Sequence, residues 1–123
     1  MWRLLFIAFF IAHGGVHLAM WLTPASTDPN APFNASHSWL LGSRRGLAVV
    51  VAVVAAVLLA AAGIGLWASA EWWRTTALVG LAVSFVLMVV YFHPWFLLIQ
   101  VINAALFVSI LWLHWPTEAM VGA

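Results

Sequence analysis

Residues 46–68 read GLAVVVAVVAAVLLAAAGIGLWA, an apolar run without a single charged side chain. A membrane core about 30 Å thick is crossed by roughly 20 apolar residues in helical form, so this run predicts a transmembrane helix. Three further runs are similarly apolar and of comparable length: residues 4–22, 75–92 and 95–115. Every charged residue lies outside these runs. We therefore predict an all-α fold with four transmembrane helices.

The composition agrees with lipid as the solvent for most of the chain. Hydrophobic residues make up 67% of the sequence and charged residues 6%, whereas a soluble domain typically contains about 25% charged residues. The formal net charge of +1 predicts no basic surface for nucleic acid. Cysteine is absent, which excludes thiolate nucleophiles, disulfide exchange and cysteine-bound clusters.

The connections between the predicted helices differ in length. Residues 69–74 and the His93-Pro94 segment are short links, and short links join antiparallel neighbours. We therefore predict an up-and-down four-helix bundle that forms a single membrane domain over residues 1–123.

The connection over residues 23–45 is much longer and has two halves. Its first half contains three prolines, which oppose regular structure. In its second half, Ser36 is a candidate helix start and Gly42 a candidate helix end. The apolar side chains between them predict a short interfacial helix at residues 36–42.

Charge gives little guidance on orientation. Arg3 and Arg74 lie at one end of the predicted bundle, and Arg44 and Arg45 lie at the other. Because the first helix usually dominates insertion, we expect the amino terminus on the cytoplasmic side of the plasma (inner) membrane. The expected partners are the lipid bilayer and either another membrane protein or a second copy of the chain.

Alanine recurs every four residues in the second predicted helix, at Ala48, Ala52, Ala56 and Ala60. Residues four apart share a helix face, so this stripe predicts close approach of another helix. We expect that helix to belong to the same chain, with a partner helix as the alternative.

Polar side chains within the predicted helices are candidates for function, because placing them in lipid is costly. His13 and His17 are four residues apart and share one face of the first helix. The up-and-down topology brings His37 of the long loop and His93 after the third helix to the same end as His17. Asn103 is near the centre of the fourth run, so we expect it at the depth of His13.

Three kinds of ligand fit these residues. Copper or zinc would be bound by the neutral imidazoles of His17, His37 and His93. A haem would take His17 and His93 as axial ligands. The carbonyl oxygens of a quinone or a lipid head group would accept hydrogen bonds from histidine and asparagine, so the candidate cofactor-binding residues are His13, His17, His93 and Asn103. The favoured alternative is that the histidines hydrogen-bond to backbone carbonyls or to Asn103 and fasten the helices together.

Four short motifs stand out along the chain: His13-Gly14-Gly15-Val16-His17-Leu18, Ala31-Pro32-Phe33, Ser38-Trp39-Leu40-Leu41-Gly42 and Phe92-His93-Pro94-Trp95. As a set they resemble a family of small four-helix membrane proteins found in actinobacteria and other bacteria. The resemblance covers nearly the whole chain and implies the four-helix fold and a bacterial inner membrane. Chain size and helix number are also similar to those of DoxX-like proteins. Neither resemblance supplies an activity or site residues.

These observations favour a non-catalytic membrane protein that acts as a subunit, an assembly partner or a lipid-facing module. The alternative is a histidine-based site for haem, metal or quinone. A small transporter is the weaker alternative, because it needs a continuous polar path. The polar residues instead become sparse toward the amino-terminal side, where His114 and Ser109 remain.

Overall fold

The computed structural model describes residues 1–22 and 37–122. Among these residues the elements follow one another along the chain as α1 (Trp2–Leu22), β1 (His37–Ser38), β2 (Gly42–Ser43), α2 (Arg45–Trp67), α3 (Trp73–Val90), the 3-10 turn η1 (Pro94–Phe96), α4 (Leu97–Leu111) and α5 (Glu118–Val121). The all-α prediction is therefore confirmed, apart from one very short hairpin.

Three of the helices, α1, α2 and α3, are long and apolar enough to cross a membrane. The predicted run at 95–115 is instead divided: η1 precedes α4, and α4 ends at Leu111 after 15 residues. Pro94 lacks the backbone donor that an α-helix interior needs, and it is the first residue of η1. Beyond the other end, His114 has φ of +50°, which lies outside α-helical geometry.

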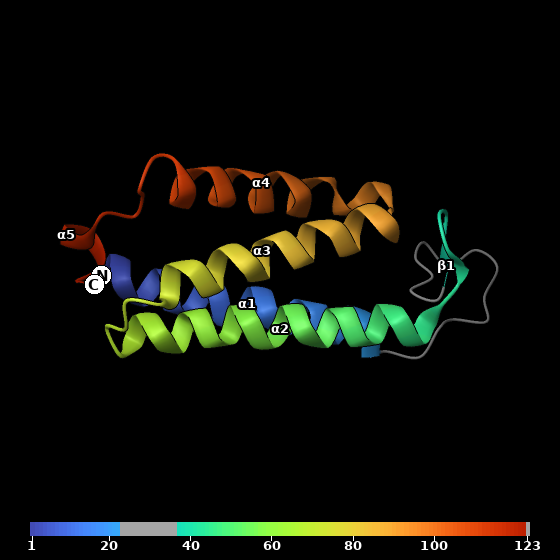
Figure 1. Ribbon diagram of the computed structural model, residues 1–123, viewed down its shortest axis with the longest axis horizontal. Helices are drawn as coiled ribbons and strands as arrows, with labels where there is room; N and C mark the ends of the chain where they lie inside the picture. Colours follow the sequence, from blue (N-terminus) through green and yellow to red (C-terminus); the bar gives the residue numbers. More distant parts are fainter. Residues whose placement is uncertain (23–36, 123) are drawn as a thin grey trace.

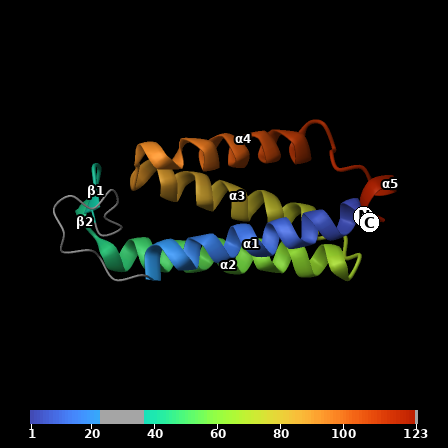
Figure 2. The same ribbon diagram turned by 180° about the vertical axis from the view of Figure 1, so that it is seen from behind.

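The long helices lie side by side, and successive helices run in opposite directions (Figure 1). The contacts follow the chain order: α2 packs on α1, α3 packs on α2, and α4 packs on α3. The view from behind shows that α4 lies farther from α1 and α2 than α3 does (Figure 2). Both chain termini and α5 are at one end of the molecule, and the hairpin is at the other.

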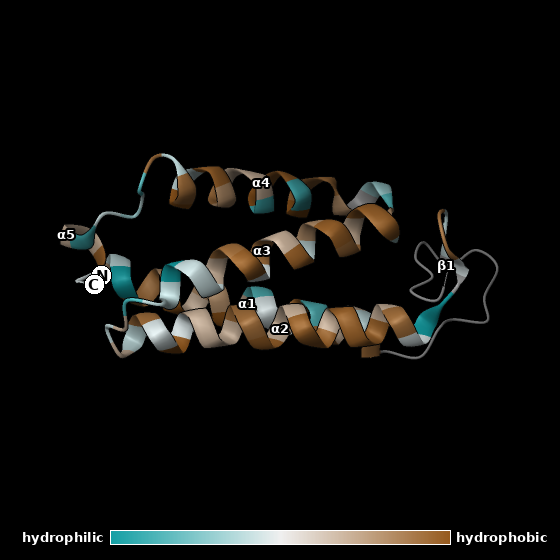
Figure 3. Ribbon diagram, viewed as in Figure 1, coloured by the Kyte–Doolittle hydropathy of each residue, from teal (hydrophilic) through white to brown (hydrophobic). Residues whose placement is uncertain are grey.

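The helices are mostly apolar in their central parts, with hydrophilic residues at the starts of α1, α2 and α3 (Figure 3). Hydrophilic residues colour the middle of α1 and α4, well away from the helix ends. Where such helices cross a membrane, polar residues at this depth need partners within the protein, because hydrocarbon offers none.

The closest helix contact joins α1 to α2. Ala48, Ala52 and Ala56 of the predicted stripe are buried, so these three pack within the chain, whereas Ala60 is half-buried. A methyl group at Gly14 would lie 2.8 Å from the backbone oxygen of Ala56, so α1 and α2 touch through their backbones here. Glycine is needed at position 14 because any side chain would push the helices apart.

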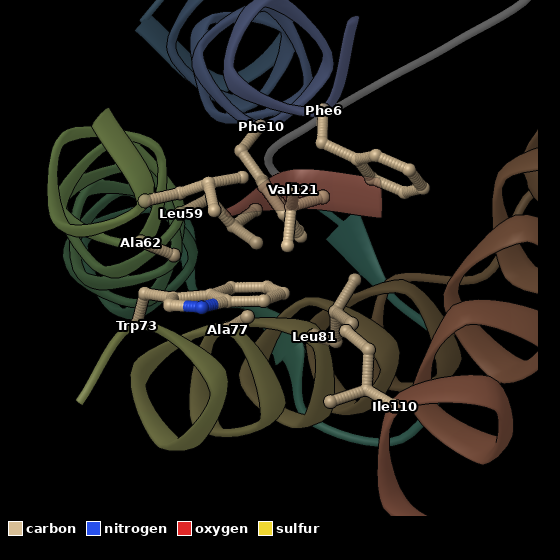
Figure 4. Close-up of a cluster of buried hydrophobic side chains, with 10 residues drawn as sticks. Phe6, Phe10, Leu59, Ala62, Trp73, Ala77, Leu81, Ile110 and Val121 are labelled. Carbon is tan, nitrogen blue, oxygen red and sulfur yellow. The ribbon is translucent and has the colours of Figure 1, made fainter. Parts of the chain in front are cut away.

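Two apolar clusters fill the interior. One is at the end near the termini, where Val121 of α5 lies among Phe6, Phe10 and Leu81 (Figure 4). The second is toward the hairpin and includes Trp21, Met88 and Phe96. The short helix α5 thus contributes a buried side chain to the core.

The predicted helix at residues 36–42 is wrong for its described residues, 37–42. His37 pairs with Ser43 and Ser38 with Gly42 in an antiparallel hairpin. Gly42 has φ of +72°, a conformation that glycine adopts readily. The Ser38 hydroxyl oxygen accepts the backbone N–H groups of Leu40 and Leu41, which stabilises the turn. Residues 23–36 lie outside the described part of the chain.

The hairpin also caps the end of α3. The last carbonyl groups of a helix have no partner within it. Here the Ser38 hydroxyl donates to the Val90 carbonyl, and the Trp39 indole N–H donates to the Val89 carbonyl at 2.7 Å. The hairpin therefore fixes where α3 ends.

Arg3 performs the corresponding task for α2 at the opposite end. Its Nε–H donates to the Leu66 carbonyl at 3.1 Å, and its Nη2 donates to the Trp67 carbonyl and to the Ser69 hydroxyl. A cation at a helix carboxyl end is also favoured by the helix dipole. This contact ties the start of α1 to the end of α2.

The α1–α2 contact predicts different effects for two adjacent glycines. Gly14→Ala should lower the free energy of unfolding by about 1–3 kcal/mol, because the new methyl group meets the Ala56 carbonyl. Gly15→Ala is the matched control: nothing lies within 4 Å of its new methyl group, so higher helix propensity should leave stability unchanged or raise it by up to about 1 kcal/mol. Unfolding in detergent measures both. Equal effects of the two substitutions would contradict the close contact.

Candidate functional site

Four polar side chains meet in the middle of the helices, and we call them the polar cluster: His13, His17, Ser84 and Asn103. Their exposed fractions are 8%, 0%, 0% and 1%. The two histidines come from α1, the serine from α3 and the asparagine from α4. The cluster therefore joins three helices at one depth.

Four hydrogen bonds connect the cluster. His13 Nε2 and Asn103 Oδ1 are 2.8 Å apart, and Asn103 Nδ2 donates to Ser84 Oγ at 2.8 Å. Ser84 Oγ is 2.7 Å from His17 Nε2. His17 Nδ1 is 2.8 Å from the backbone oxygen of His13, one turn earlier on the same helix. The side chains thus form a continuous chain that returns to its starting residue.

The fixed donors and acceptors determine where each hydrogen lies. A carbonyl oxygen cannot donate, so His17 Nδ1 carries a hydrogen and donates to His13 O. In neutral His17 the Nε2 atom is then an acceptor, and Ser84 donates its hydroxyl hydrogen to it. At the other end Asn103 Oδ1 accepts, so His13 carries its hydrogen on Nε2. All four hydrogen bonds form with both imidazoles neutral.

A series of hydrogen bonds that runs in the opposite direction requires a charged histidine. If the Asn103 amide were turned over, Ser84 would donate to it and His17 Nε2 would need its own hydrogen. His17 would then be a fully buried cation, and an uncompensated charge at the centre of a membrane-spanning helix costs at least about 2.5 kcal/mol. The neutral arrangement is therefore the stable one.

Aromatic rings cover both ends of the cluster. The Phe9 ring stacks on His13 with centroids 5.2 Å apart, and the Trp21 ring stacks on His17 at 6.2 Å. From α2, the backbone at Ala56 lies against Gly14, and the nearby Ala52 and Ala55 are buried small residues without polar side chains. The surroundings are thus apolar, which strengthens hydrogen bonds within the cluster.

Two grooves flank α4 beside the cluster. The α1/α4 groove has a volume of about 410 Å³ and is lined by Trp2, Leu5, Phe6, Phe9, Ile102, Ala105, Leu106 and Trp115. The α3/α4 groove has about 280 Å³ and is lined by Leu81, Ala82, Phe85, Val86, Asn103, Ala104, Phe107 and Val108. Asn103 is the one polar side chain among these lining residues, so both grooves suit apolar molecules.

The structure brings together three of the predicted site residues, His13, His17 and Asn103. It does not bring His93 into the cluster: His93 contacts the Phe96 ring at 6.0 Å, and Phe96 contacts Trp21, which covers His17. The His37 backbone is in β1, but its side chain lies outside the described part of the structure.

The described side chains do not show the arrangement that the metal and haem predictions require. Among the side chains described in residues 1–22 and 37–122, no three histidines or carboxylates lie close enough together to hold one metal ion. Both ring nitrogens of His17 are already in hydrogen bonds. Metal or haem ligation through His17 would require breaking one of them, so these roles stay predictions.

Ser84 is the residue that sequence reasoning did not place in the site. It is the centre of the cluster, since it bonds both His17 and Asn103. Ser84 is four residues after Gly80 and shares its helix face, but spacing on one helix does not reveal partners on two others. Gln100, three residues before Asn103 on α4, is not part of the cluster and donates to the Phe85 backbone oxygen at 3.2 Å.

Asn103→Leu should destabilise the protein by about 1–3 kcal/mol, because it leaves the His13 N–H without an acceptor in an apolar interior. Ser109→Ala is a matched control on the same helix, since the Ser109 hydroxyl bonds only its own helix, at Ala105 O. The control should change stability by less than about 0.5 kcal/mol. Chemical unfolding in detergent compares them. If Asn103→Leu left the free energy of unfolding unchanged, the cluster would not be what holds α4 in place.

Comparison of this chain with known protein families, with curated proteins and with solved structures finds no match. The resemblances noted from the sequence motifs therefore stay predictions. What the site can do is argued from its own residues and contacts.

Proposed function

We propose that this protein is a small non-catalytic module of a bacterial inner membrane, which acts as a subunit or assembly partner of a larger membrane complex. The observation that carries the proposal is the closed hydrogen-bond chain of the polar cluster. Its hydrogen bonds run from one cluster member to the next and join α1, α3 and α4. Such a cluster specifies how helices pack, which is what a structural module requires.

The finer architecture that we propose is a bundle in which α4 also crosses the membrane. Its 15 residues span about 22 Å at 1.5 Å per residue, and the three residues of η1 add about 6 Å. The sum is close to the thickness of a bilayer core, about 30 Å. Local thinning of the bilayer accommodates a short helix at modest cost.

Four crossings fit the positions of the chain ends. Both termini are at the same end of the molecule. We propose that this end faces the cytoplasm, because the first helix usually sets orientation and Arg3 directly precedes its apolar run. The hairpin would then face the opposite side of the membrane.

The apolar character of the grooves supports a structural role over transport. A transporter needs polar groups along a path through the membrane. Asn103 is the single polar side chain that lines the α1/α4 and α3/α4 grooves. Its amide oxygen is already hydrogen-bonded to His13 and its amide nitrogen to Ser84. The polar cluster is thus a joint between helices and not part of a pathway along the described grooves.

The outer face of α2 and α3 is the surface that we propose for a partner helix or a second copy of the chain. A groove of about 440 Å³ runs along it, lined by Val51, Val54, Ala82, Val83 and Val86. Branched and small side chains leave a shallow groove into which another helix can pack.

Photo-crosslinking in the native membrane tests this function. With p-benzoylphenylalanine in place of Val54, which lines the groove, we expect one discrete protein adduct, either a partner or a second copy. Val53 is the control position: it is 37% exposed, is not among the groove-lining residues, and points about 100° away from Val54 around the same helix. It should crosslink mainly to lipid.

The same partner should co-purify in mild detergent at fixed stoichiometry. Lipid adducts at both positions, together with a protein that purifies as a lone monomer, would contradict the subunit proposal.

A further inference from the structure

The turn of the hairpin presents apolar side chains that the helices do not cover. Trp39, Leu40 and Leu41 are 65%, 57% and 41% exposed. The turn is nevertheless fixed in place, because the Ser38 hydroxyl and the Trp39 indole N–H donate to carbonyl groups at the end of α3. Exposed apolar side chains beside polar ones are typical of a surface that contacts a membrane or a partner.

The hairpin is placed where the surface of a membrane would be. It runs across the direction of the helices at the end of the molecule (Figure 1 and Figure 2). With the helices across a bilayer, the hairpin therefore lies along the bilayer surface. Its turn is hydrophobic, whereas the adjacent start of α2 is hydrophilic (Figure 3). Tryptophan is enriched at this boundary between hydrocarbon and water, which suits the exposed ring of Trp39.

Two arginines follow the hairpin directly. Arg44 is exposed, and Arg45, the first residue of α2, is half-buried. The Arg44 carbonyl accepts the Tyr91 hydroxyl at 2.6 Å, which fixes this part of the backbone against the end of α3. By sequence, the connection over residues 23–45 contains these two arginines and one carboxylate, Asp28, so its net charge is positive. Asp28 itself lies outside the described residues.

The arginines at the opposite end have other tasks. Arg3 donates to the carbonyl groups that end α2, and Arg74 donates to the Pro116 carbonyl at 2.6 Å. Two carboxylates, Glu71 and Glu118, are also at that end, so its side-chain charges balance. Among the described residues, an excess of positive side chains beside an exposed apolar turn is therefore a feature of the hairpin end.

We propose that the hairpin binds the surface of an anionic lipid bilayer, with Leu40 and Leu41 inserted below the head groups and Arg44 and Arg45 close to their phosphates. Charge complementarity selects anionic lipid, since a zwitterionic lipid has no net charge to attract the arginines. Guanidinium groups also form strong paired hydrogen bonds with phosphate. Apolar insertion together with basic side chains is the combination that holds peripheral segments on membranes.

This surface is separate from the groove on α2 and α3 that we propose for a partner helix. Either proposal can therefore fail without the other. The hairpin proposal also goes beyond a structural role, because it assigns the protein a preference among the lipids around it.

The first test compares spin-labelled phosphatidylglycerol with spin-labelled phosphatidylcholine, each added to the full chain in phosphatidylcholine vesicles. Electron paramagnetic resonance measures how much of each lipid the protein immobilises. Both leaflets have the same composition, so orientation does not affect the result. We expect a preference for phosphatidylglycerol of about fivefold, the factor that one exposed arginine near an anionic surface supplies. In about 1 M salt, which screens exposed charges beyond roughly 3 Å, the preference should largely disappear.

Arg44→Gln combined with Arg45→Gln should reduce the preference to less than about twofold, because both charges are removed. Arg44→Lys combined with Arg45→Lys is the matched control and should keep most of the preference, because it retains both charges. Arg44→Gln alone changes only an exposed side chain and should lower the preference at least about twofold. Thermal unfolding in detergent checks that each variant is folded.

The second test locates the turn. The chain has no cysteine, so Leu40→Cys carries a nitroxide label at a single position. In vesicles that contain phosphatidylglycerol, this label should be more accessible to oxygen than to a water-soluble nickel complex. Glu71→Cys, at an exposed position in the link between α2 and α3, is the control and should show the reverse.

Three results would overturn the proposal. They are equal immobilisation of the two lipids, a preference that survives the glutamine substitutions, and a label at position 40 as accessible to the nickel complex as the label at position 71.

Discussion

Inside a hydrocarbon layer a polar side chain finds no water, so Ser84 must satisfy its hydroxyl group with other residues of the protein. It accepts from Asn103 on α4 and donates to His17 on α1, which joins three helices through one oxygen atom. The His13 carbonyl can only accept, so it places a hydrogen on His17 Nδ1. The cost of a buried charge then favours the direction in which His17 Nε2 accepts from Ser84 and both histidines are neutral.

The individual helices depend on the polar cluster to different degrees. Helices α1 and α2 pack closely through Gly14 and the alanine face, and their hydrogen bonds through Arg3 are at the helix ends and not in the polar cluster. Helix α4 is different, because its buried residues are Asn103 and Ile110, and grooves lie on both of its sides. Its position therefore relies on the polar cluster, and the same loose packing leaves room for a ligand or a lipid chain.

Much of this fold could be predicted from the sequence, because length and apolarity decide whether a helix can cross a membrane. The ends of elements were harder to predict. The helix expected at 36–42 is a hairpin over its described residues, since Ser38 and Trp39 bond the end of α3, far away in sequence. His13 and Asn103 could be expected at one depth, but the role of Ser84 depends on how α3 is rotated. Rotation is set by packing, and no spacing rule within one helix supplies it.

The hydrogen positions on the two imidazole rings test the central claim most directly. ¹⁵N NMR of histidine-labelled protein in lipid bilayers at neutral pH distinguishes the two tautomers of a neutral ring from the doubly protonated ring. The hydrogen-bond chain predicts that His13 carries its hydrogen on Nε2 and His17 carries its hydrogen on Nδ1. A doubly protonated His17, or His13 with its hydrogen on Nδ1, would contradict the account. Either finding would mean that the chain of hydrogen bonds runs in the opposite direction or is broken.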